Sequence, residues 1–434
     1  MLAHFTLRAL ATCQLVIAGT AWANAPTTAA NDFNDDLLAI TQKLNQYPLQ
    51  PVQLDFAEFL QSLDPKAQHS MQTLAELTAR ADTLEPLDAC QAITKQSLAF
   101  QLNLMTERRR LTQSKKPEYP GTFSQMPSGY QWYQHWLASW LQQSVSLTEL
   151  QTMAHAELES VEMLRQQLEQ NQLPTGENRA YSSKQHSTIV QAFQRREDTV
   201  NEHLTQLFNF DSRVEPVKIA PSNLPKEFPA PGIYDPASNT FIYHLQTDEL
   251  PEAHMDWLFV HEGVPGHHFQ HILANEIALC PSLNGIPMPM VMREGWAAYV
   301  ETLGTEIGLF IDQASYAYAL EWRTLRALRV LIDIGIHAHD WPDERAEALW
   351  QRYLPDNPKI MRREIARVKR WPVQAITYVY GKYLIEQALL KYATQQNEKA
   401  VRSIIFQLTN HNPLALDFVP QFITPTSDKS ETAS

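Results

Sequence analysis

A histidine-rich stretch and a carboxylate that follows it are the residues of this chain best suited to metal chemistry. The stretch reads His261-Glu-Gly-Val-Pro-Gly-His267-His268, and Glu294 follows His267 by 27 residues. Two imidazoles and a later carboxylate are the ligands from which proteins build a catalytic zinc site with one open position, and an acid beside a ligand can act as the general base. The pattern predicts a zinc hydrolase.

The spacing of the histidines departs from the usual His-Glu-x-x-His motif, in which ligands at i and i+4 share one helical face. His267 and His268 lie six and seven residues after His261, which on a straight helix puts them off the face or ~10 Å along the axis. Pro265 lacks a backbone N–H and Gly266 tolerates unusual dihedrals, so we expect a bulge that absorbs two residues. We therefore predict His261 and His267 as ligands. His268 would then line the site or pack behind it, although the sequence does not exclude His268 as the second ligand.

The motif resembles that of a known protein family. HEGVPGHHFQ with the later REGWAAYVE is similar to the bacterial family called domain of unknown function 885, and more distantly to the zinc peptidases of the thimet-oligopeptidase and carboxypeptidase Taq groups. The resemblance extends through the segments 326–337 and 374–382, which is roughly the C-terminal half of the chain. In those peptidases a distal helix carries the third ligand, with another glutamate seven residues on, and Glu294 and Glu301 reproduce that spacing.

These residues suggest a division of roles. Glu294 would complete a His-His-Glu set and leave the fourth zinc position to water, whose proton Glu262 would take. Glu301 could orient His261 or His267 through a hydrogen bond, or it could be an ordinary salt-bridged helix residue.

A developing oxyanion needs hydrogen-bond donors besides the metal. The resemblance implies Tyr378 as the first candidate, because the related peptidases carry a tyrosine on a helix at a similar distance from the metal motif; Tyr380 is the alternative. A polar stripe on an otherwise apolar helix is formed by Arg326, Arg329, Asp333 and His337. It could contain a structural Arg329–Asp333 pair, or it could supply catalytic groups, with an arginine for a substrate carboxylate and His337 as a donor to the tetrahedral intermediate.

The remaining candidates are weaker. His244, His254 and His271 lie near the motif, but each fits a core or surface position better than a ligand position. Lys382 fits a solvated lysine better than a paired one. The sequence contains no glycine-rich phosphate loop and no GxSxG motif, which argues against kinases, dinucleotide enzymes and serine hydrolases.

The N-terminus predicts export. Residues 1–23 combine one basic residue, an apolar run and Ala21-Trp22-Ala23, as in a cleaved signal peptide. A lipoprotein cysteine at Cys13 is the less favoured alternative, because little apolar sequence precedes it. We therefore expect a periplasmic protein with no membrane span. Cys90 and Cys280 would be able to form a disulfide there, or could remain buried thiols.

Net charge and apolar periodicity predict the kind of partner and the fold class. A net charge of −13 disfavours nucleic acid as a partner, and nothing in the sequence indicates an oligomeric state. We expect a mostly α protein, with one large helical domain over 24–422 and a disordered tail at 423–434. Apolar spacing predicts helices over 87–115, 128–143, 147–168, 187–208, 312–338, 342–353 and 372–393. Short strands at 216–219 and 240–244, separated by a proline-rich segment, predict a small sheet beside a deep cleft.

The sequence thus favours an exported zinc metallopeptidase that hydrolyses short peptides. The predicted ligands are His261, His267 and Glu294, and the predicted catalytic residues are Glu262, Tyr378, His337 and Arg329. Two alternatives are a zinc amidohydrolase of a non-peptide amide or ester, and an inactive helical protein that binds peptides or envelope components.

Overall fold

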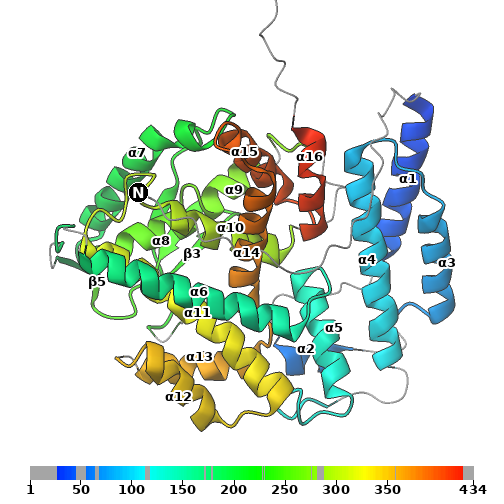
Figure 1. Cartoon of the computed structure of the whole chain (residues 1–434), viewed down its shortest axis with the longest axis horizontal. Coiled ribbons are helices and arrows are strands. Elements are labelled where there is room, and N and C mark those ends of the chain that lie inside the picture. Colours follow the sequence, from blue (N-terminus) through cyan, green and yellow to red (C-terminus); the bar gives the residue numbers. More distant parts are fainter. Residues whose placement is uncertain are drawn as a thin grey trace, which may run out of the picture.

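The computed structural model of the chain consists mainly of helices (Figure 1), which confirms the predicted fold class. It describes residues 27–44, 55–63, 68–112, 118–170, 173–176, 179–226, 228, 230–274, 276–280, 288–356 and 358–423, with side chains from residue 33 onward. The predicted signal peptide, Cys13 and the predicted tail apart from Ile423 lie outside these residues. Within the described chain, no helix has the length and apolar character needed to span a bilayer.

Helices account for most of the described residues, and short 3-10 turns join some of them. The α-helices are α1 Thr27–Leu44, α2 Phe56–Ser62, α3 Met71–Asp82, α4 Ala89–Leu111, α5 Gly129–Leu141, α6 Leu147–Gln170, α7 His186–Leu207, α8 Met255–Glu262, α9 His267–Leu273, α10 Met290–Val300, α11 Gln313–His339, α12 Asp343–Tyr353, α13 Pro358–Arg370, α14 Ile376–Tyr392, α15 Glu398–Leu408 and α16 Val419–Phe422. The 3-10 turns are η2 Glu252–His254, η3 Glu301–Leu303 and η4 Pro413–Phe418. All seven helices predicted from apolar spacing are present, with ends that differ by at most a few residues.

Helix α6 illustrates why the sequence forms these elements. The Ser146 hydroxyl accepts a hydrogen bond from the Glu149 backbone N–H at 3.1 Å and so satisfies a donor in the first turn. The buried residues of α6 include Leu150, Met153, Ala154, Leu158 and Val161, which recur every three or four positions. This stripe faces the protein interior, and α6 lies along α11.

Five short strands form two small sheets. Strands β1 Ala180–Ser182 and β5 Glu249–Pro251 pair antiparallel, whereas β2 Lys218–Pro221, β4 Thr240–Tyr243 and β3 Gly232–Asp235 form a sheet in the order β2-β4-β3. The sheet contains the two strands predicted near 216–219 and 240–244. The sequence prediction missed β3, because the prolines around it suggested an irregular segment. Strand β3 pairs antiparallel with β4 and packs against α8.

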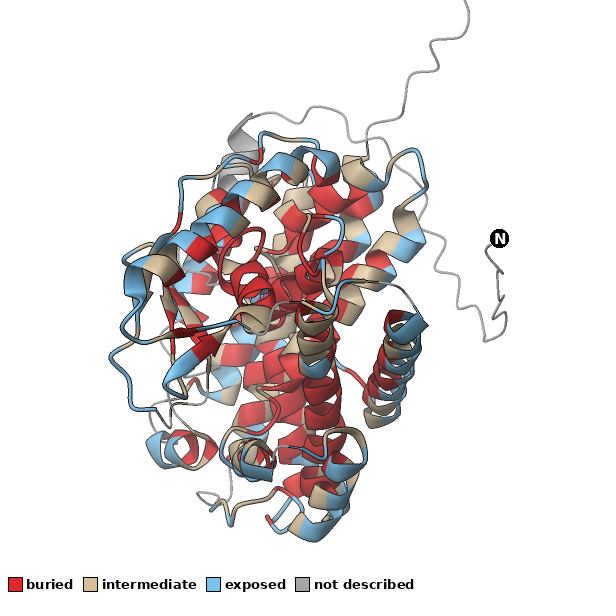
Figure 2. Cartoon of the chain, turned by 90° about the vertical axis from the view of Figure 1, so that its left-hand side faces the viewer, coloured by how far each residue is buried: buried red, intermediate tan, exposed pale blue. Residues whose placement is uncertain are grey.

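The buried hydrophobic residues that the structure describes form one large core, a smaller core, and a third cluster of Val161, Leu168 and Leu320. The large core extends from α2 to α16, and Figure 2 shows buried positions concentrated in the central helices. The smaller core joins α1, α3 and α4 through residues such as Leu37, Leu74 and Leu102, at the right of Figure 1. A disulfide between Cys90 on α4 and Cys280 ties these helices to the segment that follows α9. Of the two states that the sequence allowed, a disulfide or two buried thiols, the structure shows the disulfide.

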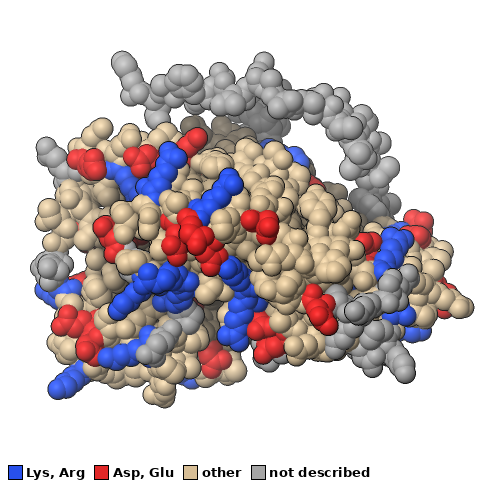
Figure 3. Space-filling model, turned by 90° about the horizontal axis from the view of Figure 1, so that it is seen from below, with Lys and Arg blue, Asp and Glu red and all other residues tan. Residues whose placement is uncertain are grey.

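Acidic and basic side chains lie interspersed on the face shown in Figure 3.

Candidate metal centre

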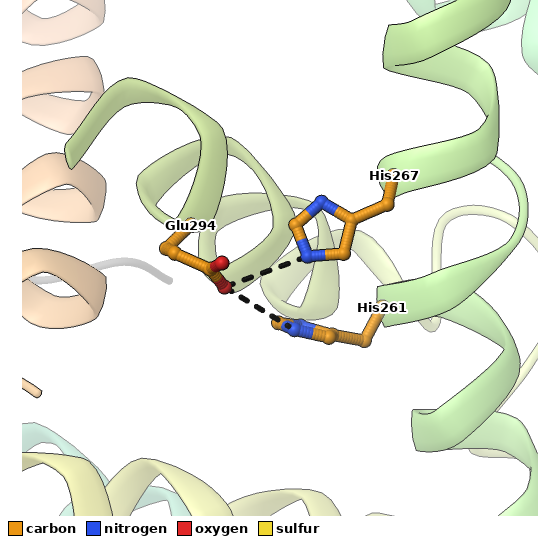
Figure 4. Close-up of side chains that lie close together, drawn as sticks. All are labelled: His261, His267 and Glu294. Atoms are coloured by element: carbon orange, nitrogen blue, oxygen red, sulfur yellow. Dashed lines mark ion pairs between the residues drawn. The ribbon is translucent and has the colours of Figure 1, made fainter. Parts of the chain in front are cut away.

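Three side chains from three helices meet at one point in the interior. His261 lies in the last turn of α8, His267 begins α9 and Glu294 lies on α10. One Glu294 carboxylate oxygen is 3.8 Å from His261 Nε2 and 3.4 Å from His267 Nε2 (Figure 4). One ligand atom from each of the three residues lies within 4.8 Å of the others. The structure thus brings together the three residues predicted as ligands.

A break between α8 and α9 produces this convergence. The helix stops at Glu262, where the Gly263 N–H donates to Phe259 O at 2.8 Å, and it resumes only at His267. A Cβ on Gly266 would stand 2.1 Å from His261 O, so only glycine fits where the chain folds back. The Trp296 indole N–H on α10 donates to Pro265 O at 2.8 Å and fastens the turn to the helix of Glu294. The predicted bulge is therefore a four-residue interruption.

Glu301 orients His261 from behind. Glu301 Oε1 lies 2.7 Å from His261 Nδ1, and the other oxygen of Glu301 pairs with Arg326. With Nδ1–H donating to Glu301, the Nε2 lone pair of His261 faces Glu294. Burial opposes ionisation of Glu301, but Arg326 and His261 together hold its pKa below the usual value. His267 lacks such support, since its buried Nδ1 has no hydrogen-bond partner among the described residues.

A backbone hydrogen bond holds the carboxylate of Glu262 in place. One of its carboxylate oxygens accepts a hydrogen bond from the Tyr234 backbone N–H at 2.8 Å. The side chain borders the same cavity as the three clustered residues. Strand β3, which the sequence prediction missed, therefore fixes this carboxylate.

Tyr378 reaches the cavity through close packing of α14 on α10. A Cβ on Gly295 would stand 2.4 Å from Gly381 Cα, so the two backbones touch one turn away from Tyr378. The Tyr378 ring lies 6.2 Å from the His261 ring. Burial and the Glu294 carboxylate raise the pKa of Tyr378 despite nearby arginines. Tyr380, the alternative, is buried elsewhere and accepts a hydrogen bond from Gln143.

Charge concentrates around the three clustered side chains. Burial alone would raise the pKa of Glu294, but His267, Arg293 and His261 hold it well below its usual range. Burial lowers and the Glu294 and Glu262 carboxylates raise the pKa of His267, with a net upward shift. His267 and Glu294 thus stabilise each other's charged forms.

A cavity of about 490 Å³ opens onto the cluster. Residues 230–234 and 236 form one wall, and Trp257, Trp322, Arg326, Arg329, Arg367 and Tyr378 are among those that line the rest. A volume of this size accommodates a small ligand. A second cavity of about 830 Å³ shares Pro231 and Trp322 with the first.

The four polar residues of the α11 stripe have different partners and lie in different places. Arg326 and Arg329 line the cavity, but Arg329 binds Glu364 at 2.7 Å rather than Asp333, so the predicted Arg329–Asp333 pair is wrong. Asp333 instead accepts from the Tyr133 hydroxyl and the Val373 N–H, each at 2.7 Å, and burial raises its pKa to about 7. His337 is not among the residues that line either cavity. It lies in the core, where Nε2 donates to Val368 O at 3.1 Å and Nδ1 accepts from Phe123 N–H.

The other histidines lie outside the cluster. His268 is fully buried and donates to Glu215 O at 2.7 Å, which leaves His267 as the partner of Glu294. His271 lines the cavity, whereas His244 and His254 line the second cavity, where His254 stacks on Tyr318. Lys382, expected to be solvated, is buried and pairs with Glu157 at 2.8 Å and Glu386 at 3.0 Å.

Sequence reasoning missed two kinds of cavity residue. Trp257 and Trp322 stack with ring centroids 4.1 Å apart, and Trp257 also stacks on His261. Arg367 lines the cavity from α13. The tryptophans were missed because their spacing in the sequence is that of ordinary core residues. Arg367 stood among the many basic residues of α13, a pattern typical of a solvated face.

Comparison with known proteins identifies a family and no activity. The family model described as "Bacterial protein of unknown function (DUF885)" matches residues 23–402. A crystal structure titled a "putative lipoprotein" from Colwellia psychrerythraea superposes with a TM-score of 0.56 at 18% identity, over 91% of this chain and 74% of that one. A "putative lipoprotein of unknown function" from Shewanella oneidensis gives 0.52 at 17%, over 90% and 73%. No curated protein matches this chain.

Proposed function

The chain belongs to the bacterial DUF885 family, and from the geometry of its site we propose that it is a zinc-dependent metallopeptidase that hydrolyses short peptides. The observation that carries the proposal is the convergence of His261, His267 and Glu294 on one point beside Glu262. Such a set is known from zinc enzymes in which two histidines and a glutamate hold the metal and leave one position open.

The ligand atoms suit zinc in type, and two of their spacings approach those of a zinc site. In a tetrahedron with bonds of ~2.1 Å, neighbouring ligands lie ~3.4 Å apart. The two nitrogen-to-oxygen distances of 3.4 and 3.8 Å approach this value. The hydrogen bond from His261 to Glu301 is the kind of outer contact that metal-binding histidines make.

Bound there, zinc would polarise a substrate carbonyl and lower the pKa of a water molecule toward ~7. Glu262, held by the Tyr234 N–H, would take the proton of the attacking water and pass it to the leaving amine. Tyr378 lines the same cavity and would stabilise the developing oxyanion, because its raised pKa keeps its proton available to donate.

We also propose that the protein is exported. Two observations support this: the disulfide between Cys90 and Cys280 is the kind that persists in oxidising compartments, and the two solved structures described above are each titled a "putative lipoprotein".

Substitution of Glu262 tests the proposed activity. Glu262→Gln keeps the side-chain shape but removes the base, so we expect one zinc per chain to remain while hydrolysis of a mixed peptide library falls by about three orders of magnitude. Glu276→Gln, at an exposed position outside the cavity, is the matched control. Hydrolysis by Glu262→Gln at the wild-type rate, measured by mass spectrometry, would contradict the assignment.

A further inference from the structure

One buried carboxylate next to the cavity faces three arginines. The side chain of Glu364 on α13 is only 2% exposed. Its Oε2 is 2.7 Å from both Nε and Nη2 of Arg329 and 4.0 Å from Arg367, while its Oε1 is 3.5 Å from Arg363. We call these four residues the Glu364 cluster. It carries two more positive charges than negative ones.

Arg367 is the member of the cluster whose position suits a ligand. Its side chain is 22% exposed and lines the cavity together with Glu262 and Glu294. Its other hydrogen bond goes to a neutral partner: Nη2 donates to Gln374 Oε1 at 2.6 Å. Arg329 already binds Glu364 through two nitrogens, so Arg367 shares a carboxylate that is largely neutralised.

The other charges of the cavity do not offset this excess. Arg326 is balanced by Glu301, and Arg293 lies 3.6 Å from Glu294. Glu262 and Glu294 are the acids of the cavity wall, and a bound divalent cation would more than neutralise Glu294. The cavity would then be cationic in a chain whose net charge is −13. Partly buried guanidinium groups that share a single counter-ion are costly, so the arrangement favours an anionic ligand.

We propose that Arg367 forms an anion subsite that binds a carboxylate of the peptide substrate. The planar guanidinium fork matches a carboxylate, and a desolvated, charge-assisted pair is stronger than a neutral hydrogen bond. The carboxylate belongs either to the peptide C-terminus or to an acidic side chain near the scissile bond. Because this inference rests on the proposed peptidase function, its test must distinguish failure of the anion subsite from failure of the peptidase proposal.

The test measures discrimination between charged and neutral peptides. Wild type and Arg367→Gln would be compared on trialanine, trialanine amide and Ala-Ala-Glu amide. We expect wild type to prefer a carboxylate-bearing peptide over trialanine amide by about 10- to 100-fold in kcat/KM, mainly through KM. Arg367→Gln should reduce that ratio to near one. A preference for trialanine would identify the C-terminal carboxylate, and a preference for Ala-Ala-Glu amide the side-chain carboxylate.

Arg363→Gln is the matched control. Arg363 lies one turn earlier on α13 and also faces Glu364, but it lines the second cavity. This variant should keep the discrimination of wild type. Equal rates on all three peptides in wild type, or discrimination that survives in Arg367→Gln, would overturn the inference.

Binding separates this inference from the catalytic proposal. Calorimetric titration of the zinc-loaded Glu262→Gln variant with the same peptides does not require turnover. Tighter binding of a carboxylate peptide, lost on adding Arg367→Gln, would support the subsite even if no peptide were hydrolysed. Equal affinity for acid and amide would contradict the subsite even if hydrolysis occurred.

Discussion

At the scale of single residues, the site depends on a carboxylate that would not touch the metal. Glu301 joins His261 to Arg326, and all three side chains are buried. Such outer contacts fix the tautomer and orientation of a ligand histidine and raise its basicity. His267 has no such partner in the described chain, so we expect the two histidines to depend differently on their surroundings.

Glu301→Gln tests this dependence. The amide cannot hold Arg326 and His261 as the carboxylate does, so zinc affinity should fall about 10- to 100-fold. Competition with a fluorescent chelator measures the affinity, and Glu306→Gln at an exposed position of the following turn is the control. Wild-type zinc affinity in folded Glu301→Gln would show that this contact does not tune the site.

Residue types and spacing were enough to predict that His261, His267 and Glu294 lie together, whereas the contact of Glu301 with His261 was one of two interpretations that the sequence allowed. They were not enough for His337, which shares a helical stripe with Arg326 but satisfies backbone groups in the core. A side chain's direction along a buried 27-residue helix depends on which helices pack around it, and the sequence of that helix does not contain this information.

At the scale of elements, a break in a helix replaces the regular spacing of ligands. Pro265 and Gly266 predicted a distortion, and the structure realises it as separate helices α8 and α9. The extent of the break follows from packing, because Trp296 on another helix holds the turn. Strand β3 was missed for a related reason: its pairing with β4 overrides its proline-rich surroundings.

Gly266→Ala should disrupt both the fold and the site. The added Cβ would meet His261 O at 2.1 Å and Val260 O at 2.2 Å, so the turn must shift. We expect a loss of about 1–3 kcal/mol in the free energy of unfolding, together with weaker zinc binding. Urea denaturation and zinc titration measure the two effects.

Gly121→Ala controls for a general glycine effect. Gly121 has positive φ but nothing within 4 Å of the added Cβ, so it should lose some stability yet keep zinc affinity. Equal zinc affinity in both variants would contradict the steric requirement at Gly266.

At the scale of the whole molecule, a disulfide links α4, which contributes to both the large and the smaller core, to the segment after α9. Cys90 lies on α4, which packs against α1 and α3. Cys280 lies between α9 and α10, the helix that carries Glu294. The sequence identified the two cysteines as a possible pair. It could not decide whether they meet, because their separation of 190 residues is bridged only in the folded chain.

Removing the disulfide should lower stability without removing the metal ligands. For Cys90→Ala combined with Cys280→Ala we expect a loss of about 2–5 kcal/mol, because the unfolded chain gains freedom. Thermal melts of this variant and of wild type with and without reductant measure the change. Equal melting temperatures would mean that the linkage contributes little to the native state.

The central claim is that one zinc ion binds His261, His267 and Glu294 together. Anomalous diffraction at the zinc edge, from crystals of zinc-loaded protein, tests it most directly. We predict a single peak ~2.1 Å from both Nε2 atoms and from a Glu294 oxygen, absent in His261→Ala. A zinc peak bound by other residues, or no peak at this position after zinc loading, would contradict the account.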